Sequence, residues 1–310
     1  MRKKWILSIL VLALLLPAAV SATSIDTNVI NEKWGKPTYA YGASLDQAQI
    51  EETMELLGIE NPENVNSVSV SGQDLVKYLG DGIDSTDSMI SSVLVTRQDR
   101  GRGVEVDIRT PDRITQITAN QYASAAITAG VTDAKILVGA VRPVTGESAL
   151  TGVFKAFDVN GEELDQDRMQ VAQEEIDTTN EIVQENKEDA GFSTEQFNAA
   201  IAEIKTQLQS LRERQDELAT REDIERIINE ALEKYQLNNI ITKEQIDRLI
   251  SLFERYQNTD AVVSPEVKEQ LGELGNRLGD IYQQAQDSGI LDQIAAFFRQ
   301  LWNALKNIFS

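Results

Sequence analysis

Few side chains in this chain could support chemistry, because its 310 residues include no cysteine and no histidine. Their absence excludes Ser-His-Asp and Cys-His catalysis, disulfide bonds, and zinc sites built on cysteine or histidine ligands. The chemistries that remain use carboxylates, a serine–lysine pair, or a hard cation held by oxygen atoms. Three short segments carry side chains of these kinds.

The first segment is a polar loop that contains Thr145, Gly146, Glu147 and Ser148. It follows the apolar run 136–141, which does not alternate and therefore predicts a central strand that is covered on both faces. A short apolar helix is predicted directly after the loop. Such a loop can hold an anion at the helix N-terminus through Thr145, Gly146 and Ser148. Since Glu147 would put a carboxylate at the same place, the alternative is a loop that only caps the helix.

The second segment has three aspartates at a spacing of three, Asp81, Asp84 and Asp87. They could hold calcium, but they lack the ligand order and closing glutamate of an EF-hand, so a solvated loop is the alternative. The third segment is the pair Glu174-Glu175, which could be imagined as acid and base. Adjacent helix residues point about 100° apart, and we interpret this pair as part of a solvated helix face.

The first 22 residues have the pattern of a secretory signal peptide. Residues 2–4 are basic, and residues 5–16 are apolar but too short to span a bilayer. Val20 and Ala22 fit the small-residue rule, so we expect the mature chain to begin at Thr23. The predicted localisation is secreted and extracellular, with retention at the cell envelope as one option.

The mature chain is strongly acidic. Without residues 1–22 it has 26 Lys and Arg against 50 Asp and Glu, which gives a formal charge of −24. Such a surface repels nucleic acid and anionic lipid, so no nucleic-acid partner is expected. No later run reaches the ~20 apolar residues of a transmembrane helix.

Residues 36–160 predict an α/β domain with a mixed sheet of about five strands. The third and fourth strands should form a hairpin over the polar connection 97–102. The expected strands are 36–42, 65–70, 91–96, 103–109 and 136–141.

Residues 162–286 predict an acidic, all-α and partly coiled-coil region. One helix has apolar residues at the spacing of three heptads, namely Phe197, Ile201, Ile204, Leu208, Leu211 and Leu218. The last helix of this region contains Gly272, Gly275 and Gly279, each of which costs about 1 kcal/mol against alanine. These glycines indicate either close packing on a neighbour or a weak helix.

Residues 288–310 predict an amphipathic C-terminal helix with the aromatic anchors Phe297, Phe298, Trp302 and Phe309. Three interpretations stay open: packing on the helical region, contact with a partner or a second copy, and binding to a membrane surface. The membrane is the least favoured because the acidic chain is repelled by anionic lipid. The expected partners are therefore other envelope proteins, or the chain itself through its C-terminal helices.

Several motifs resemble a family of secreted Gram-positive bacterial proteins known as domain of unknown function number one thousand and two. The resemblance covers about residues 39–176 and implies no particular activity, and at Glu147 the family usually has a small or hydroxyl residue. Its strongest parts are Pro143-Val144-Thr145-Gly146, Ser148-Ala149-Leu150-Thr151-Gly152, Lys155-Ala156-Phe157 and Lys77-Tyr78-Leu79-Gly80.

The sequence favours a non-enzymatic, secreted envelope protein that binds other proteins or itself. No cofactor is expected, apart from calcium as an option. The alternative is a carboxylate-dependent enzyme or binder that acts on cell-wall glycan or teichoic polymer. A glycosidase of that kind would need two carboxylates about 5 to 9.5 Å apart in a groove.

Overall fold

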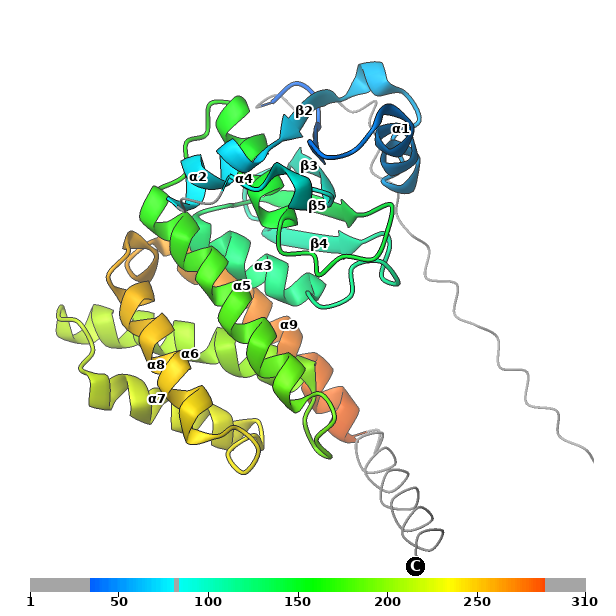
Figure 1. The fold of residues 1–310 in the computed structure, drawn as a ribbon. Helices are drawn as coiled ribbons and strands as arrows, with labels where there is room; N and C mark the ends of the chain where they lie inside the picture. The colour runs from blue at the N-terminus through cyan, green and yellow to red at the C-terminus, as the bar shows by residue number, and fades with distance from the viewer. Residues whose placement is uncertain (1–33, 81–83, 288–310) are drawn as a thin grey trace, which may run out of the picture.

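The computed structural model of the protein describes residues 34–80 and 84–287, and Figure 1 shows their fold. The N-terminal part is a mixed five-stranded sheet with four helices, and the rest is mainly helical, as predicted. The sheet consists of β1 (Thr38–Gly42), β2 (Asn66–Val70), β3 (Ser92–Arg97), β4 (Val104–Ile108) and β5 (Ala134–Gly139). The helices are α1 (Gln47–Leu56), α2 (Gly72–Leu79), α3 (Ala119–Ala129), α4 (Ala149–Val159), α5 (Gln166–Asn186), α6 (Thr194–Gln215), α7 (Arg221–Lys234), α8 (Lys243–Gln257) and α9 (Pro265–Asp287), with 3-10 turns at Pro62–Asn64, Thr86–Ser88 and Asp260–Val262.

Strand β5 is central and covered on both faces, as its continuous apolar sequence predicts. It pairs antiparallel with β3 on one edge and parallel with β4 on the other. Ile136 and Val138 belong to the main core, whereas Leu137 belongs to a smaller cluster on the opposite face, beside α1. The strand order is β2-β1-β3-β5-β4.

The predicted hairpin between β3 and β4 is wrong, because β5 lies between these two strands. Their connection instead crosses the start of β5. There, an Asp133 side-chain oxygen accepts hydrogen bonds from the backbone N–H groups of Gly101, Arg102 and Gly103 at 2.9, 3.0 and 3.1 Å. The fully apolar β5 takes the inner position, and β4, which exposes Glu105, takes the edge.

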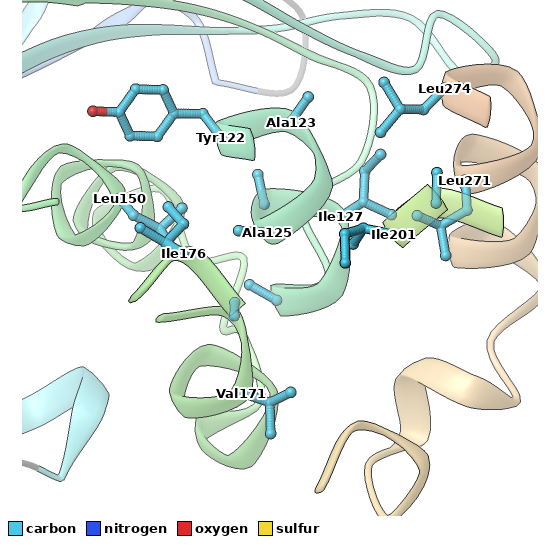
Figure 2. Close-up of a cluster of buried hydrophobic side chains, with 14 of the residues drawn as sticks. Tyr122, Ala123, Ala125, Ile127, Leu150, Val171, Ile176, Ile201, Leu271 and Leu274 are labelled. Atoms are coloured by element: carbon cyan, nitrogen blue, oxygen red, sulfur yellow. The ribbon is translucent and has the colours of Figure 1, made fainter. Parts of the chain in front are cut away.

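One apolar core joins the sheet to the later helices through α3 (Figure 2). This helix is rich in alanine, and Ala125 and Ile127 are fully buried. Its small side chains let α5 approach closely on one side, while α3 also contacts β4 and α9. Figure 1 accordingly shows α5 and α9 lying beside α3. The helical half is therefore built onto α3 instead of forming a separate arm.

The heptad residues of α6 lie mainly in this same core. Those from Phe197 to Leu211 are at most 5% exposed, and α6 packs on α7 and α9. Leu218 lies beyond the end of α6 at Gln215 and is 45% exposed. The stripe is thus used for packing within the chain, and a coiled coil is not shown.

The glycines of α9 line a groove of about 330 Å³ between α9, α6 and α7. A Cβ atom at Gly275 would lie 3.9 Å from the Ala202 Cβ, an ordinary contact. A Cβ at Gly272 or Gly279 would meet no atom within 4 Å. Within the described residues, close packing does not require glycine at these positions.

We therefore expect Gly272→Ala and Gly279→Ala each to raise the free energy of unfolding by up to about 1 kcal/mol, because alanine favours the helix and fits. Urea unfolding measures the change. The control is Gly58→Ala, which also has open space but a φ of +75°, and it should lower stability. A loss of stability in both α9 variants would contradict the prediction.

Candidate functional site

The predicted ligand loop at the start of α4 is bonded closely to the rest of the protein. Gly146 has a φ of +109°, and its carbonyl accepts a hydrogen bond from the Tyr122 hydroxyl at 2.5 Å. The Thr145 carbonyl accepts from the backbone N–H of Ile117 at 3.4 Å. Ser148 occupies the N-cap position of α4, but its side chain makes no cap hydrogen bond. The structure thus brings Thr145, Gly146 and Ser148 together in one loop, and the hydrogen bonds described here hold this loop to the rest of the protein.

The structure describes two of the three residues proposed to bind a metal. Asp81 lies outside the described residues, and Asp84 and Asp87 are exposed. No group of three or more Asp and Glu among the described residues could hold a metal ion. The predicted signal peptide 1–22 and the predicted anchors Phe297, Phe298, Trp302 and Phe309 also lie outside the described residues.

The interpretation of Glu174-Glu175 as a solvated face is wrong for Glu175, which is 4% exposed. Its neighbour Glu174 points toward α8 and forms an ion pair with Arg255 at 2.5 Å. Because the two side chains diverge by about 100°, only Glu175 points into the junction of α3, α5 and α6.

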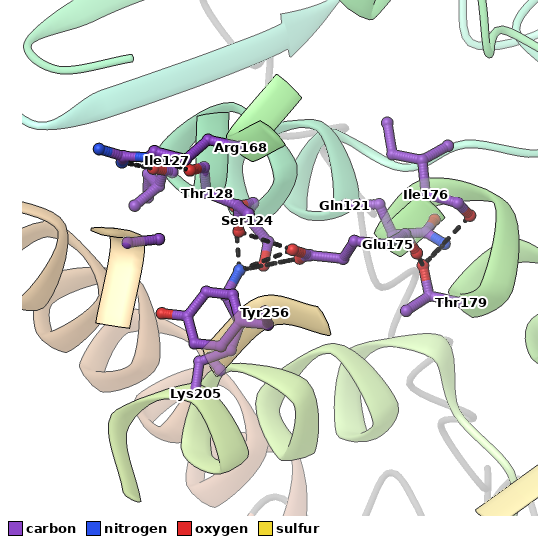
Figure 3. Close-up of polar contacts among 12 residues, drawn as sticks. Gln121, Ser124, Ile127, Thr128, Arg168, Glu175, Ile176, Thr179, Lys205 and Tyr256 are labelled. Atoms are coloured by element: carbon purple, nitrogen blue, oxygen red, sulfur yellow. Dashed lines mark hydrogen bonds and ion pairs between the residues drawn. The ribbon is translucent and has the colours of Figure 1, made fainter. Parts of the chain in front are cut away.

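Glu175 forms a buried ion pair with Lys205 on α6 (Figure 3). The Lys205 Nζ donates to both carboxylate oxygens of Glu175 at 2.9 Å, and to the Ser124 Oγ at 2.9 Å. Glu175 also accepts from the Thr128 hydroxyl at 2.7 Å. The ring of Tyr256 on α8 lies 5.6 Å from the ammonium. One polar cluster therefore connects α3, α5, α6 and α8.

Burial lowers the pKa of the Lys205 ammonium below its ordinary value, and the Glu175 carboxylate opposes this shift. The Lys205 side chain is fully buried and its hydrogen bonds are made within the cluster. A serine–lysine dyad needs a neutral lysine to take the serine proton, whereas Glu175 stabilises the charged form. The geometry thus favours a structural role, in which the cluster holds the helices together, over a role in which Ser124 attacks a substrate.

Sequence reasoning missed Lys205, although its position contained a signal. Lys205 follows Ile201 by four residues and precedes Leu208 by three, so it lies on the apolar face of α6. Ser124 and Thr128 are likewise four residues apart on α3. A lysine on an apolar stripe predicts a buried partner of opposite charge, but only the fold identifies that partner as Glu175.

A surface pocket of about 450 Å³ lies between α2, α4 and the start of α5. Its charged rim includes Lys77 and Asp158, which form an ion pair at 2.6 Å. The Tyr78 hydroxyl donates to the same Asp158 oxygen at 2.8 Å. Burial alone would raise the pKa of Asp158, but these two hydrogen bonds, together with the charges of Lys77 and Lys155, outweigh it and lower the pKa. Phe154 and Met169 form an apolar floor.

Comparison with known proteins assigns the chain to a family. The family described as Protein of unknown function (DUF1002) matches residues 41–274. The chain belongs to this family. The uncharacterized protein YpuA of Bacillus subtilis (strain 168) is 29% identical over 315 residues, and the alignment covers all of both chains. No solved structure matches the chain.

The DUF1002 match confirms the resemblance predicted from the motifs and extends it well beyond residue 176. It reaches residue 274 and so includes α6, α7, α8 and the first part of α9. The helices that cover α3 therefore belong to the family unit. None of the helices described for this DUF1002 member is both long and apolar enough to cross a membrane.

In this DUF1002 chain, the loop before α4 approaches an acidic part of α5. Asp177 is exposed, yet protein atoms crowd its carboxyl and raise its pKa to about 6; the Gln173 side chain opposes this with a hydrogen bond, and the carboxylates of Glu147 and Glu181 add to the increase. A pKa that is raised in the folded state gives stability that is complete below pH ~4. That stability is lost as the pH rises through about 6.

Asp177→Asn should therefore reduce the loss of stability that the protein shows between pH 4 and 7. The asparagine is similar in size and cannot ionise, so the repulsion with Glu147 and Glu181 disappears. Melting temperatures measured across this range compare the two proteins. Identical pH profiles would show that Asp177 is not the group responsible.

Proposed function

We propose that this protein is exported and acts at the cell envelope by binding, without catalysis. One observation carries the proposal: the set Ser124, Glu175 and Lys205, whose side-chain types could act on a substrate, is enclosed between helices. A substrate would have to separate α5 from α6 to reach Lys205. The signal-like residues 1–22 and the acidic mature chain support an extracellular place of action.

The proposed partners are other envelope proteins or a second copy, contacted through the C-terminal helices. The anchors Phe297, Phe298, Trp302 and Phe309 would supply apolar contact area. Coiled-coil pairing stays a further proposal for this contact, but it would need apolar residues other than the α6 stripe, because Phe197 to Leu211 are already buried within the chain and Leu218 lies beyond the helix. A membrane surface is a less favoured partner for a chain of this charge.

The experiment is chemical cross-linking of the mature protein on intact cells, followed by pull-down. We expect cross-links to envelope proteins or to a second copy that are lost when the chain is stopped at Gly289. Circular dichroism of the shortened protein checks that it stays folded. The proposal would be wrong if the intact protein is found inside the cell, or if cross-linking recovers no partner and no dimer.

A second candidate is a binder or carboxylate-dependent enzyme that acts on cell-wall glycan or teichoic polymer. The observation that favours it is the pocket beside α2, which Asp158, Glu163 and Asp165 line. Release of soluble fragments from purified wall polymer would indicate an enzyme, provided that Asp158→Asn or Glu163→Gln abolishes the release. Binding without release would indicate a binder.

No cofactor forms part of either proposal, and calcium is tested separately. If Asp84 and Asp87 contribute to a calcium site, added calcium should raise the melting temperature of the mature protein. An unchanged melting temperature would remove calcium from consideration.

A further inference from the structure

We propose that the pocket between α2, α4 and α5 binds a ligand through a primary ammonium group attached to a small apolar body. This inference rests on the proposed function, because it assumes that the protein acts by binding. It adds the chemical class of the ligand. The ammonium of the ligand would occupy the position that the Lys77 ammonium occupies in this structure, next to Asp158.

The surroundings of the Lys77 Nζ are those of an ammonium-binding site. The Nζ lies 2.6 Å from the Asp158 Oδ2 and 5.0 Å from the centroid of the Tyr78 ring. A carboxylate and an aromatic face are the two groups that attract an ammonium most strongly in proteins. The Tyr78 hydroxyl bonds to the same Asp158 oxygen at 2.8 Å and so fixes the carboxylate in place.

Lys77 can leave this position without loss of the fold. Its side chain is 56% exposed, so its ammonium can move into water along a flexible stem. Exposed ion pairs of this kind contribute little to stability. Asp158 and Tyr78 are less exposed and remain bonded to each other, which leaves a pre-formed acceptor for another ammonium.

The pocket is larger than an ammonium ion requires. Its volume of about 450 Å³ is within the range of small-molecule sites. Leu164 is partly exposed and gives the ligand apolar surface to cover, above the buried Phe154 and Met169. A ligand with an apolar body next to its ammonium would use both features.

The charges at the rim favour a cation over an anion. Asp158, Glu163 and Asp165 line the pocket, against the single cation Lys77. An anion would normally seek the N-terminus of α5, but there the Asp165 side chain already accepts the backbone N–H of Arg168 at 2.9 Å. The formal charge of −24 on the mature chain adds a long-range attraction for cations.

The test compares three probes of the same length, hexylammonium, 1-hexanol and hexanoate, on the full mature protein at low salt. Changes in the NMR spectrum give the dissociation constants. We expect hexylammonium to bind saturably and at least about tenfold more tightly than hexanol, with hexanoate the weakest. Equal binding of hexylammonium and hexanol would overturn the proposal.

Three variants test the assigned residues. Lys77→Met keeps the stem but removes the competing ammonium, and should tighten hexylammonium binding about tenfold. Asp158→Asn should weaken it to the level of hexanol. Lys268→Met is the matched control, because it removes one positive charge from an exposed ion pair with Glu213, and neither residue lines the pocket. It should change binding by less than about twofold.

Two further results complete the test. If circular dichroism shows that Asp158→Asn unfolds the protein, Glu163→Gln at the exposed rim replaces it and should weaken binding severalfold. If Lys77→Met and Lys268→Met have the same effect, only net charge matters and the site is refuted. The proposed function would survive that outcome, since it depends on cross-linking to envelope partners and not on amine binding.

Discussion

Lys205→Met is expected to lower the free energy of unfolding by about 3 to 5 kcal/mol, the usual cost of leaving one charge of a buried pair without its partner. The Glu175 carboxylate would remain almost fully buried, with only hydroxyl groups such as those of Ser124 and Thr128 to donate to it. Urea denaturation followed by circular dichroism measures the loss.

Two comparisons isolate the cause. The double variant Lys205→Met with Glu175→Leu removes both charges and should recover most of the lost stability, because apolar side chains can replace a buried pair. Lys268→Met breaks an exposed pair with Glu213 and should cost at most about 1 kcal/mol. If Lys205→Met lowers the free energy of unfolding no more than Lys268→Met does, the buried pair does not stabilise the fold as proposed.

The second large effect is expected from Gly146→Ala, with a loss of about 2 to 5 kcal/mol. Gly146 has a φ of +109°, where an L residue is strained. An added Cβ would lie 2.4 Å from the Tyr122 hydroxyl oxygen and 2.9 Å from the Ile114 Cγ2. Since Tyr122 is buried in the core, it has little room to move. Thermal and urea unfolding both measure this change.

Gly161→Ala is the matched control for this substitution. Gly161 has a φ of +77°, but its added Cβ would meet no atom within 4 Å. It should therefore show only the backbone cost, about 1 kcal/mol. Equal losses in the two variants would show that contact with Tyr122 contributes nothing.

Much of the secondary structure could be predicted because its signals are local. Thr118, Thr220 and Thr242 each form the capping box expected from the residue three positions later. Gly130 ends α3 in the left-handed conformation that its sequence position indicates. The apolar sequence of β5 likewise predicted a central strand. These features depend on neighbours within a few residues.

The errors concern contacts between distant residues. That β3 pairs with β5 and not with β4 involves distant contacts, and Asp133 at the start of β5 binds the 101–103 backbone from 30 or more residues away. The direction of Glu175 depends on Lys205, 30 residues later, and on Ser124, 51 residues earlier. A helical period shows that adjacent glutamates diverge, but the packing of other helices decides which one is buried. The candidate site was therefore less predictable than the elements that build it.

The packing of later helices on α3 has a consequence for the order of folding. The helix contacts α5, α6 and α9, and α9 is the last of these to be synthesised. The shared core, which includes Leu271, Leu274 and Leu278, cannot close until nearly the whole chain has been made. Such non-local closure makes cooperative folding a late event. If residues 1–22 direct export, as we propose, late folding would keep the polypeptide extended long enough to pass through a translocation channel.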